Sequence, residues 1–224
     1  FFALRTQALT LLAQGQERSG DLTGAQKNYE ALLASAVEGG NQRQIADHQN
    51  SISGVLLLRE QYVAALRHSD ESLPRFKTLK LPYDIVYASL RRVDILWQLG
   101  RLDEADRDLD AMFSRDSGMG KPIPSYEHAR ALRRARVLLA RGENARAAGI
   151  ASNSLARADV SSGTRAALQR VLCLALARSS RASEALSQLE AATGAAAEST
   201  YPGASAQTAL ARSEVLLRLR RYEE

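Results

Sequence analysis

Three histidines and a single cysteine are the residues of this chain best suited to holding a metal ion. They are His48, His68, His128 and Cys173. Protein zinc sites usually combine ligands at short spacings, such as two residues four apart on one helix face. None of these four residues has another ligand type at that spacing. The sequence therefore predicts no metal site, with His48 in a groove or solvated and the other two histidines on the surface.

The segment Gly118 to Pro122, GMGKP, contains the glycine–lysine pair of a phosphate-binding loop. Such a loop follows a strand, has a glycine five residues before that pair, and places Ser or Thr after the lysine. Arg115 and Pro122 occupy those two places. The segment is therefore predicted to be a flexible linker without a phosphate site.

Carboxylates cluster at Asp103, Glu104 and Asp106, just after a predicted turn. Negative charge is favourable in the first turn of a helix, where the helix dipole is positive, so a capping role explains the cluster. No combination of Ser, His and Asp has support from its positions along the chain. We therefore expect no catalytic residues, no cofactor and no enzymatic activity.

Arginines form the densest basic feature on two predicted helices. They are Arg91, Arg92, Arg130, Arg133, Arg134 and Arg136. One interpretation is a solvated face that pairs with Asp94, Asp106 and Glu127. The other is a site for an acidic peptide or a C-terminal carboxylate, because a guanidinium group binds carboxylates through two parallel hydrogen bonds.

The composition indicates a helical chain built on small apolar residues. Of its 224 residues 45% are hydrophobic and only 5% aromatic, so Ala, Leu, Val and Ile must supply the core. Alanine and leucine favour helices, and no run alternates as a strand would. The net charge is +5. The arginines are scattered beside carboxylates rather than gathered in a stripe, which argues against a nucleic-acid partner.

Cys173 lies in the apolar run Val171 to Leu176 and is expected to be buried as a small hydrophobic residue. One cysteine excludes an intrachain disulfide and fits a cytoplasmic location. No apolar stretch reaches the ~20 residues needed to cross a bilayer, so no membrane partner is expected. The chain starts without an initiator Met and stops within a repeat, so we expect a fragment of a longer protein.

Helix breaks recur at nearly constant intervals along the chain. They are centred on Gly20, Glu60, Gly100, Gly142, Ser180 and Arg220, so successive breaks are about 40 residues apart. Five residues after each of the first five breaks stands an alanine, namely Ala25, Ala65, Ala105, Ala147 and Ala185. Seven residues before the breaks stand the small or medium residues Ala13, Ser53, Val93, Ala135, Cys173 and Ser213. Both columns predict close helix crossings, which require small side chains.

Each repeat then consists of a first helix, a tight turn, a second helix and a linker. Gly, Pro, Ser and Asn mark most of the linkers. The linkers are expected near 38–41, 79–82, 114–125, 161–163 and 193–203.

The pattern is clearest in SGDLTGAQKNY, Ser19 to Tyr29, and in LGRLDEA, Leu99 to Ala105. It resembles the tetratricopeptide (TPR) repeat family, with a small residue, a glycine-containing turn, and then alanine and an aromatic residue. The unit is longer than the usual TPR unit and lacks its closing proline, as in the long repeats of bacterial regulators and kinesin light chain. The resemblance implies an all-α fold, a right-handed α-α superhelix (solenoid) of tandem antiparallel helix hairpins. We expect one solenoid over 1–224, with repeats near 1–40, 41–80, 81–122, 123–162, 163–202 and an incomplete 203–224.

In the resembled family, the first helix of each hairpin lines a groove that binds peptides. Carried over to this chain, groove positions lie one residue, or one turn plus one residue, from the packing column. The resulting peptide-binding residues are Gln14, Asp47, Asn50, Tyr87, Leu90, Asp94, Trp97, Arg136 and Arg170. For Trp97 the alternative is packing inside its hairpin against Ala105.

Three functional hypotheses follow. The first is a scaffold or sensor region of a larger bacterial regulatory or signalling protein, binding a protein or peptide segment with acidic and apolar groups. The second is the non-catalytic repeat arm of an enzyme, such as a signalling kinase or a caspase-like protease, with its catalytic domain elsewhere. A third is self-association through exposed repeat ends.

Overall fold

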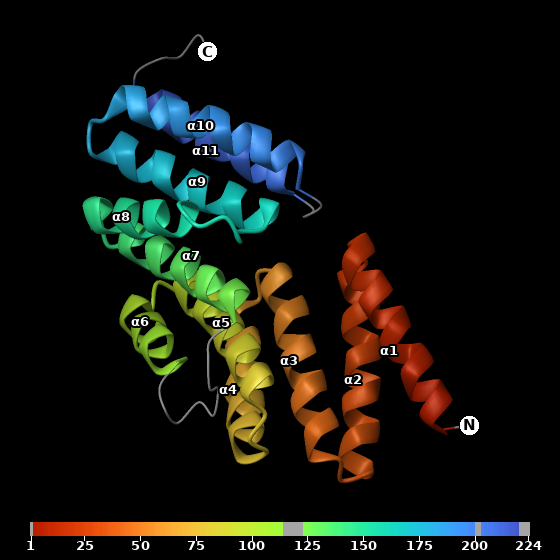
Figure 1. The fold of residues 1–224 in the computed structure, drawn as a ribbon. Coiled ribbons are helices and arrows are strands. Elements are labelled where there is room, and N and C mark those ends of the chain that lie inside the picture. The colour runs from red at the N-terminus through yellow and green to blue at the C-terminus, as the bar shows by residue number, and fades with distance from the viewer. Residues whose placement is uncertain (1, 114–122, 200–202, 220–224) are drawn as a thin grey trace. The chain divides into compact units, whose positions relative to one another are not determined.

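The computed structural model describes residues 2–113, 123–199 and 203–219, which form eleven α-helices (Figure 1). The helices are α1 (Phe2–Ser19), α2 (Leu22–Glu38), α3 (Gln42–Leu58), α4 (Tyr62–Thr78), α5 (Pro82–Gln98), α6 (Leu102–Ala111), α7 (Pro124–Ala140), α8 (Asn144–Leu155), α9 (Ser162–Arg178), α10 (Ala182–Ala197) and α11 (Ala204–Arg218). These described ranges contain no strand. The all-α prediction is confirmed.

The chain divides into two compact units, residues 1–120 with α1 to α6 and residues 121–224 with α7 to α11. In the first unit each helix packs on the next, and α3 also contacts α5. In the second unit α7, α8, α9, α10 and α11 pack in the same sequential manner, and α9 also contacts α7 and α11. We call the odd-numbered helices A helices and the even-numbered helices B helices.

The turns between helices share one hydrogen-bond pattern. After α3, the Glu60 amide donates to the Leu57 carbonyl at 3.1 Å, and the Gln61 amide donates to the Leu56 carbonyl at 2.9 Å. Together these bonds define the Schellman motif, in which the residue after the helix cap adopts a left-handed conformation. Glu60 accordingly has a φ of 60°. The same pair of bonds closes α2, α4, α5, α7 and α9.

In the first unit, the left-handed turn residues divide the repeat period into equal halves. They stand at regular intervals, at Gly20, Gly40, Glu60, Lys80 and Gly100. Helices α2 to α5 are each 17 residues long, and three residues make each turn between them. Each half is therefore one helix plus one turn, and the connection between hairpins is as short as the turn within a hairpin.

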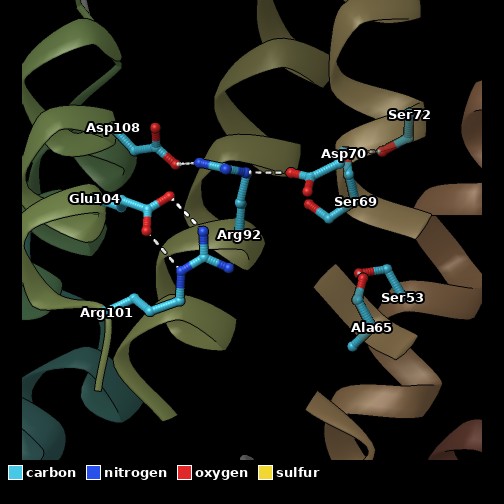
Figure 2. A network of polar contacts seen from close by, with 9 residues as sticks. All are labelled: Ser53, Ala65, Ser69, Asp70, Ser72, Arg92, Arg101, Glu104 and Asp108. Atoms are coloured by element: carbon cyan, nitrogen blue, oxygen red, sulfur yellow. Dashed lines mark hydrogen bonds and ion pairs between the residues drawn. The ribbon is translucent and has the colours of Figure 1, made fainter. Parts of the chain in front are cut away.

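The two columns of small residues lie at the helix crossings. The five alanines at Ala25, Ala65, Ala105, Ala147 and Ala185 are all fully buried. In the second hairpin the crossing also holds a hydrogen bond, from Ser53 Oγ to the Ala65 carbonyl at 2.9 Å (both residues appear in Figure 2). Ser213 on α11 is the exposed member of its column, since no described helix follows α11.

Three predicted linkers are wrong in their bounds. The helix α7 begins at Pro124, so the last two residues of the predicted linker 114–125 are helical. The connection between α8 and α9 runs over residues 156–161, because Ser161 caps α9 by accepting a hydrogen bond from the Thr164 amide, so Ser162 and Gly163 are helical. Residues 193–197 also remain in α10, where Thr193 Oγ1 donates to the Leu189 carbonyl at 2.9 Å. Alanine-rich sequence sustains this helix beyond the predicted boundary. The segment Gly118 to Pro122 lies outside the described residues.

Cys173 is fully buried, as predicted. Burial raises the pKa of its thiol to about 12, so the thiolate is not accessible near neutral pH. Of the helices described, not one combines the length and apolar character needed to cross a membrane.

Candidate functional site

One side of α5 carries a row of exposed and half-buried side chains. Tyr83, Tyr87, Arg91 and Asp94 follow one another at spacings of four, four and three residues, which places them on one helix face. The two tyrosines are 55% and 51% exposed. The other sides of α5 are buried, mostly through apolar residues. The row is therefore the part of α5 that remains for solvent or a partner.

Arg91 lies across this row and reaches the neighbouring A helix, α3. Its guanidinium carbon is 4.9 Å from the centroid of the Tyr87 ring, and Nη2 donates to the Tyr87 hydroxyl at 2.9 Å. Nη1 donates to the backbone carbonyl of Asn50 on α3. Among the described residues, no carboxylate forms an ion pair with Arg91. The cation is thus fixed in place without being neutralised.

A second pair of contacts links the same two helices. Arg43 on α3 lies 3.9 Å from Asp47 on its own helix and 3.7 Å from Asp84 on α5, nitrogen to oxygen. Partial burial and the nearby Asp84 charge raise the pKa of Asp47, and Arg43 opposes this only in part. We define the α3–α5 face as Arg43, Asp47, Asp84, Tyr83, Tyr87, Arg91 and Asp94.

The α3–α5 face contains three of the predicted site residues, Asp47, Tyr87 and Asp94. Asn50 and Leu90 are instead buried, at 6% and 5% exposure, so their side chains do not belong to this surface. They occupy the inner side of their helices because the packing of α3 and α5 turns these positions toward the neighbours.

The other predicted residues of the first unit lie outside the residues that define this face. Gln14 is exposed on α1, and Trp97 is partly buried near the end of α5. The sequence analysis missed Tyr83 and Arg43. The signal for Tyr83 was its position one helical turn before Tyr87.

In the second unit the two predicted arginines have different environments. Arg136 is partly buried on α7. Arg170 on α9 is only 7% exposed, and its guanidinium donates to Thr208 Oγ1 at 3.2 Å and to Gln207 Oε1 at 2.8 Å, both on α11. Arg170 therefore ties α9 to α11.

On the other side of α5, Arg92 forms the centre of a polar network (Figure 2). Its Nε atom donates to Asp70 on α4 at 2.7 Å, and Nη1 donates to Asp108 on α6. Burial acts to lower the pKa of Arg92, but the two carboxylates outweigh it and raise that pKa. Arg92 therefore joins the B helices on either side of its own helix.

The prediction that His128 lies on the surface is wrong, because the end of α8 and the loop after it cover this part of α7. His128 is 3% exposed, with Nδ1 2.7 Å from Ser154 Oγ and Nε2 2.9 Å from Asp159 Oδ1. Arg157 Nη2 also contacts Asp159, at 2.9 Å. A Ser–His–Asp set is therefore present, contrary to the sequence analysis, but Ser154 is buried and has no open side for a substrate.

His48 is also buried, at 7% exposure, and burial lowers its pKa, which favours the neutral imidazole. The prediction of a groove or solvated position for His48 is wrong, because α3 is enclosed by α2, α4 and α5. Within the described ranges, no group of three or more His, Cys, Asp or Glu side chains could hold a metal ion.

Comparison with known proteins identifies the class of fold. No family model matches the chain, and no curated protein matches it. A crystal structure of nearly identical TPR-like repeats assigned to a kinesin light chain of Podosopora anserina superposes with a TM-score of 0.65 at 17% identity, covering 88% of this chain and 97% of that one. A single-substitution variant of it gives 0.67 at 17% identity, with coverages of 87% and 95%.

The chain therefore has a TPR-like repeat fold. Folds of this class commonly mediate protein–protein interaction, on the extended surfaces that stacked hairpins create.

Proposed function

We propose that the chain binds a protein or peptide segment on the α3–α5 face, as a scaffold or sensor region of a larger bacterial regulatory or signalling protein. The observation that carries the proposal is the exposed pair Tyr83 and Tyr87 beside a fixed, unneutralised guanidinium group. Tyrosine and arginine are among the residues most enriched at the energetic centres of protein interfaces.

The chemistry of the face favours a segment with an apolar side chain next to a carboxylate. The tyrosine rings offer apolar area that is already ordered, so little side-chain entropy is lost on binding. The Arg91 guanidinium has five N–H donors, and the structure uses two of them for Asn50 and Tyr87. Gln14, Asp94 and Trp97 are proposed to extend the contact, and Arg136 is proposed as a separate partner contact within the second unit.

The competing proposal, a repeat arm of an enzyme, differs only in what accompanies the chain. The sequence flanking the chain would separate the two, since only one of them requires a catalytic domain. The chain itself is proposed to be non-catalytic.

Self-association through repeat ends is proposed as an additional property. It is supported by α11, on which Leu210 and Leu217 are 73% and 61% exposed. Both lie on the helix face that also bears Ser213, the position covered by a B helix in the complete hairpins. Analytical ultracentrifugation of the parent and of a Leu210→Glu, Leu217→Glu double variant would test this, with a monomeric parent as the contradicting result.

The binding proposal is tested by a pull-down with the chain, followed by peptide mapping and calorimetry on the mapped segment. Tyr87→Ala should weaken binding by about 2 kcal/mol, the typical loss at an interface hot spot. Val63→Ala is the matched control, because Val63 is 77% exposed on α4, away from this face. Equal affinities for the parent and the folded Tyr87→Ala variant would place the partner elsewhere.

A further inference from the structure

Gly54 is a glycine in the interior of α3, a place where glycine weakens a helix relative to alanine. It stands six residues before the left-handed turn residue Glu60. The equivalent positions of the other A helices up to α9 carry side chains, namely Gln14, Asp94, Arg136 and Leu174. Three of these were predicted to be groove residues. The second hairpin therefore has no side chain of its own at this position.

The space beside Gly54 is filled from the next A helix. A Cβ atom added to Gly54 would lie 2.7 Å from the Arg91 guanidinium carbon and 2.9 Å from Nη2. Nη1 of the same group donates to the Asn50 carbonyl, one turn earlier on α3. The guanidinium group thus rests on the bare backbone of α3, where any larger residue would displace it.

We propose that Gly54 is a positioning residue for the binding surface. Because Gly54 has no side chain, the Arg91 guanidinium group occupies this surface position. There it binds a carboxylate of the partner segment. This inference rests on the proposed function of the α3–α5 face.

The charges around Arg91 support this assignment. Arg92, the next residue, has Asp70 and Asp108 as counter-ions, whereas the described residues give Arg91 only the neutral acceptors Asn50 and Tyr87. The α3–α5 face also carries Asp47, Asp84 and Asp94, so it is the donors left on Arg91, rather than the net charge of the face, that favour an anionic group from outside. Because the Tyr87 ring and the α3 backbone already hold Arg91, a ligand carboxylate meets a pre-ordered donor and little flexibility is lost.

The first test concerns the contact between Gly54 and the Arg91 guanidinium group, and it needs no ligand. Gly54→Ala should melt at the same or a higher temperature, since a flexible side-chain end can move aside and alanine favours the helix. NMR of arginine side chains should show that the Nη–H signals of Arg91, which the bonds to Asn50 and Tyr87 hold in place, are lost in this variant as they are in Arg91→Ala. Gly149→Ala is the control, because an added Cβ there meets nothing within 4 Å. An unchanged Arg91 signal in Gly54→Ala would overturn the proposal.

The second test uses a short peptide selected by display on the parent chain and counter-selected on Tyr87→Ala. Gly54→Ala and Arg91→Ala should each weaken its binding about tenfold, which is about 1.4 kcal/mol. The double variant should lose no more than either single one, because both changes remove the same group. A copy of the peptide with its carboxylates replaced by amides should not distinguish Gly54→Ala from the parent.

The outcomes separate the two proposals. If no peptide depends on Tyr87, the proposed function fails, and the binding role of Gly54 fails with it. If a Tyr87-dependent peptide binds Gly54→Ala as tightly as the parent, the face is a binding site but Gly54 does not position its cation.

Discussion

Arg91 and Arg92 are consecutive residues on α5, yet they belong to two different regions of the first unit. Arg92 faces the B helices and is neutralised by Asp70 and Asp108, with its side chain only 16% exposed. Arg91 faces α3, rests on the Tyr87 ring and has no carboxylate among the described residues. Successive helix residues point about 100° apart, so one residue step moves a guanidinium group from the packed side of the helix to the open side.

The difference indicates which region holds the fold together and which one remains for a partner. The charge of a guanidinium group between two carboxylates is already balanced, and a third carboxylate would be repelled by the first two. A guanidinium held by a ring and a carbonyl has donors left. The same residue type therefore has a structural role on the B-helix side of α5 and a binding role on the A-helix side.

The largest loss of stability is expected at the crossing of α5 and α6, on the B-helix side of α5. Ala105 is fully buried where α6 crosses α5, so Ala105→Leu should overpack the crossing and lower the free energy of unfolding by about 1–3 kcal/mol. Thermal melts would measure this. Ala111→Leu, at an exposed position of the same helix, is the control. A melting temperature equal to that of the parent would show that the crossing lies elsewhere.

Arg92→Ala should be the next most damaging change. It removes charge-assisted hydrogen bonds to two B helices and the packing of the arginine stem, at a cost of about 1–2 kcal/mol. Arg101→Ala is the matched control, because the Arg101–Glu104 pair beside it in Figure 2 is exposed and joins residues only three apart. Such solvent-exposed pairs contribute little to stability. Equal losses in urea titrations of the two variants would contradict a special role for Arg92.

Arg91→Ala should have a smaller effect on stability than Arg92→Ala but a larger effect on binding. Its cost to folding should stay below about 1 kcal/mol, the usual value of a solvent-accessible cation–π contact. Its effect on a bound acidic segment should appear as slower association and a weaker dependence on salt. Stopped-flow kinetics at two ionic strengths would measure both. If Arg91→Ala destabilises the chain as much as Arg92→Ala does, Arg91 has a structural role as well.

The smallest effect is expected for Asp47→Asn. The pKa of Asp47 is raised in the folded chain by burial and by Asp84, so folding favours its protonated form. The stability that protonation provides is complete below the unfolded value, about 4, and is lost as the pH rises through the folded value. Asp47→Asn should therefore melt slightly higher than the parent at neutral pH and equal to it in acid below the unfolded value. A lower melting temperature at neutral pH would mean that the Arg43 contact outweighs both effects.

The fold could be predicted from the sequence because its strongest signals are local. Ala25 and Ala65 recur at fixed distances from the turns, and small residues at crossings have few alternatives. The linkers near 38–41 and 79–82 were also predicted, but their conformation was not, since Lys80 adopts a left-handed conformation that its residue type does not suggest. Tertiary contacts impose that conformation through the Schellman hydrogen bonds.

The site was harder to predict because it depends on contacts between helices. Tyr87 and Asp47 were found from their register alone. Nothing local indicates that Arg91 reaches the carbonyl of Asn50, 41 residues earlier, or that Gly54 makes room for it. The burial of His128 likewise depends on a loop that starts more than a helix length later, at Ala156.

The three-residue turns also bear on how such a chain can change over generations. In the turn after α3, Gln61 donates to the helix that ends and accepts from the helix that begins, so an inserted residue would break this shared hydrogen-bond pattern. A substitution changes no length and leaves these backbone bonds in place. Most side chains of such an array can therefore change while the turns stay the same. The fold is accordingly compatible with very different sequences, in keeping with a TM-score of 0.67 at 17% identity.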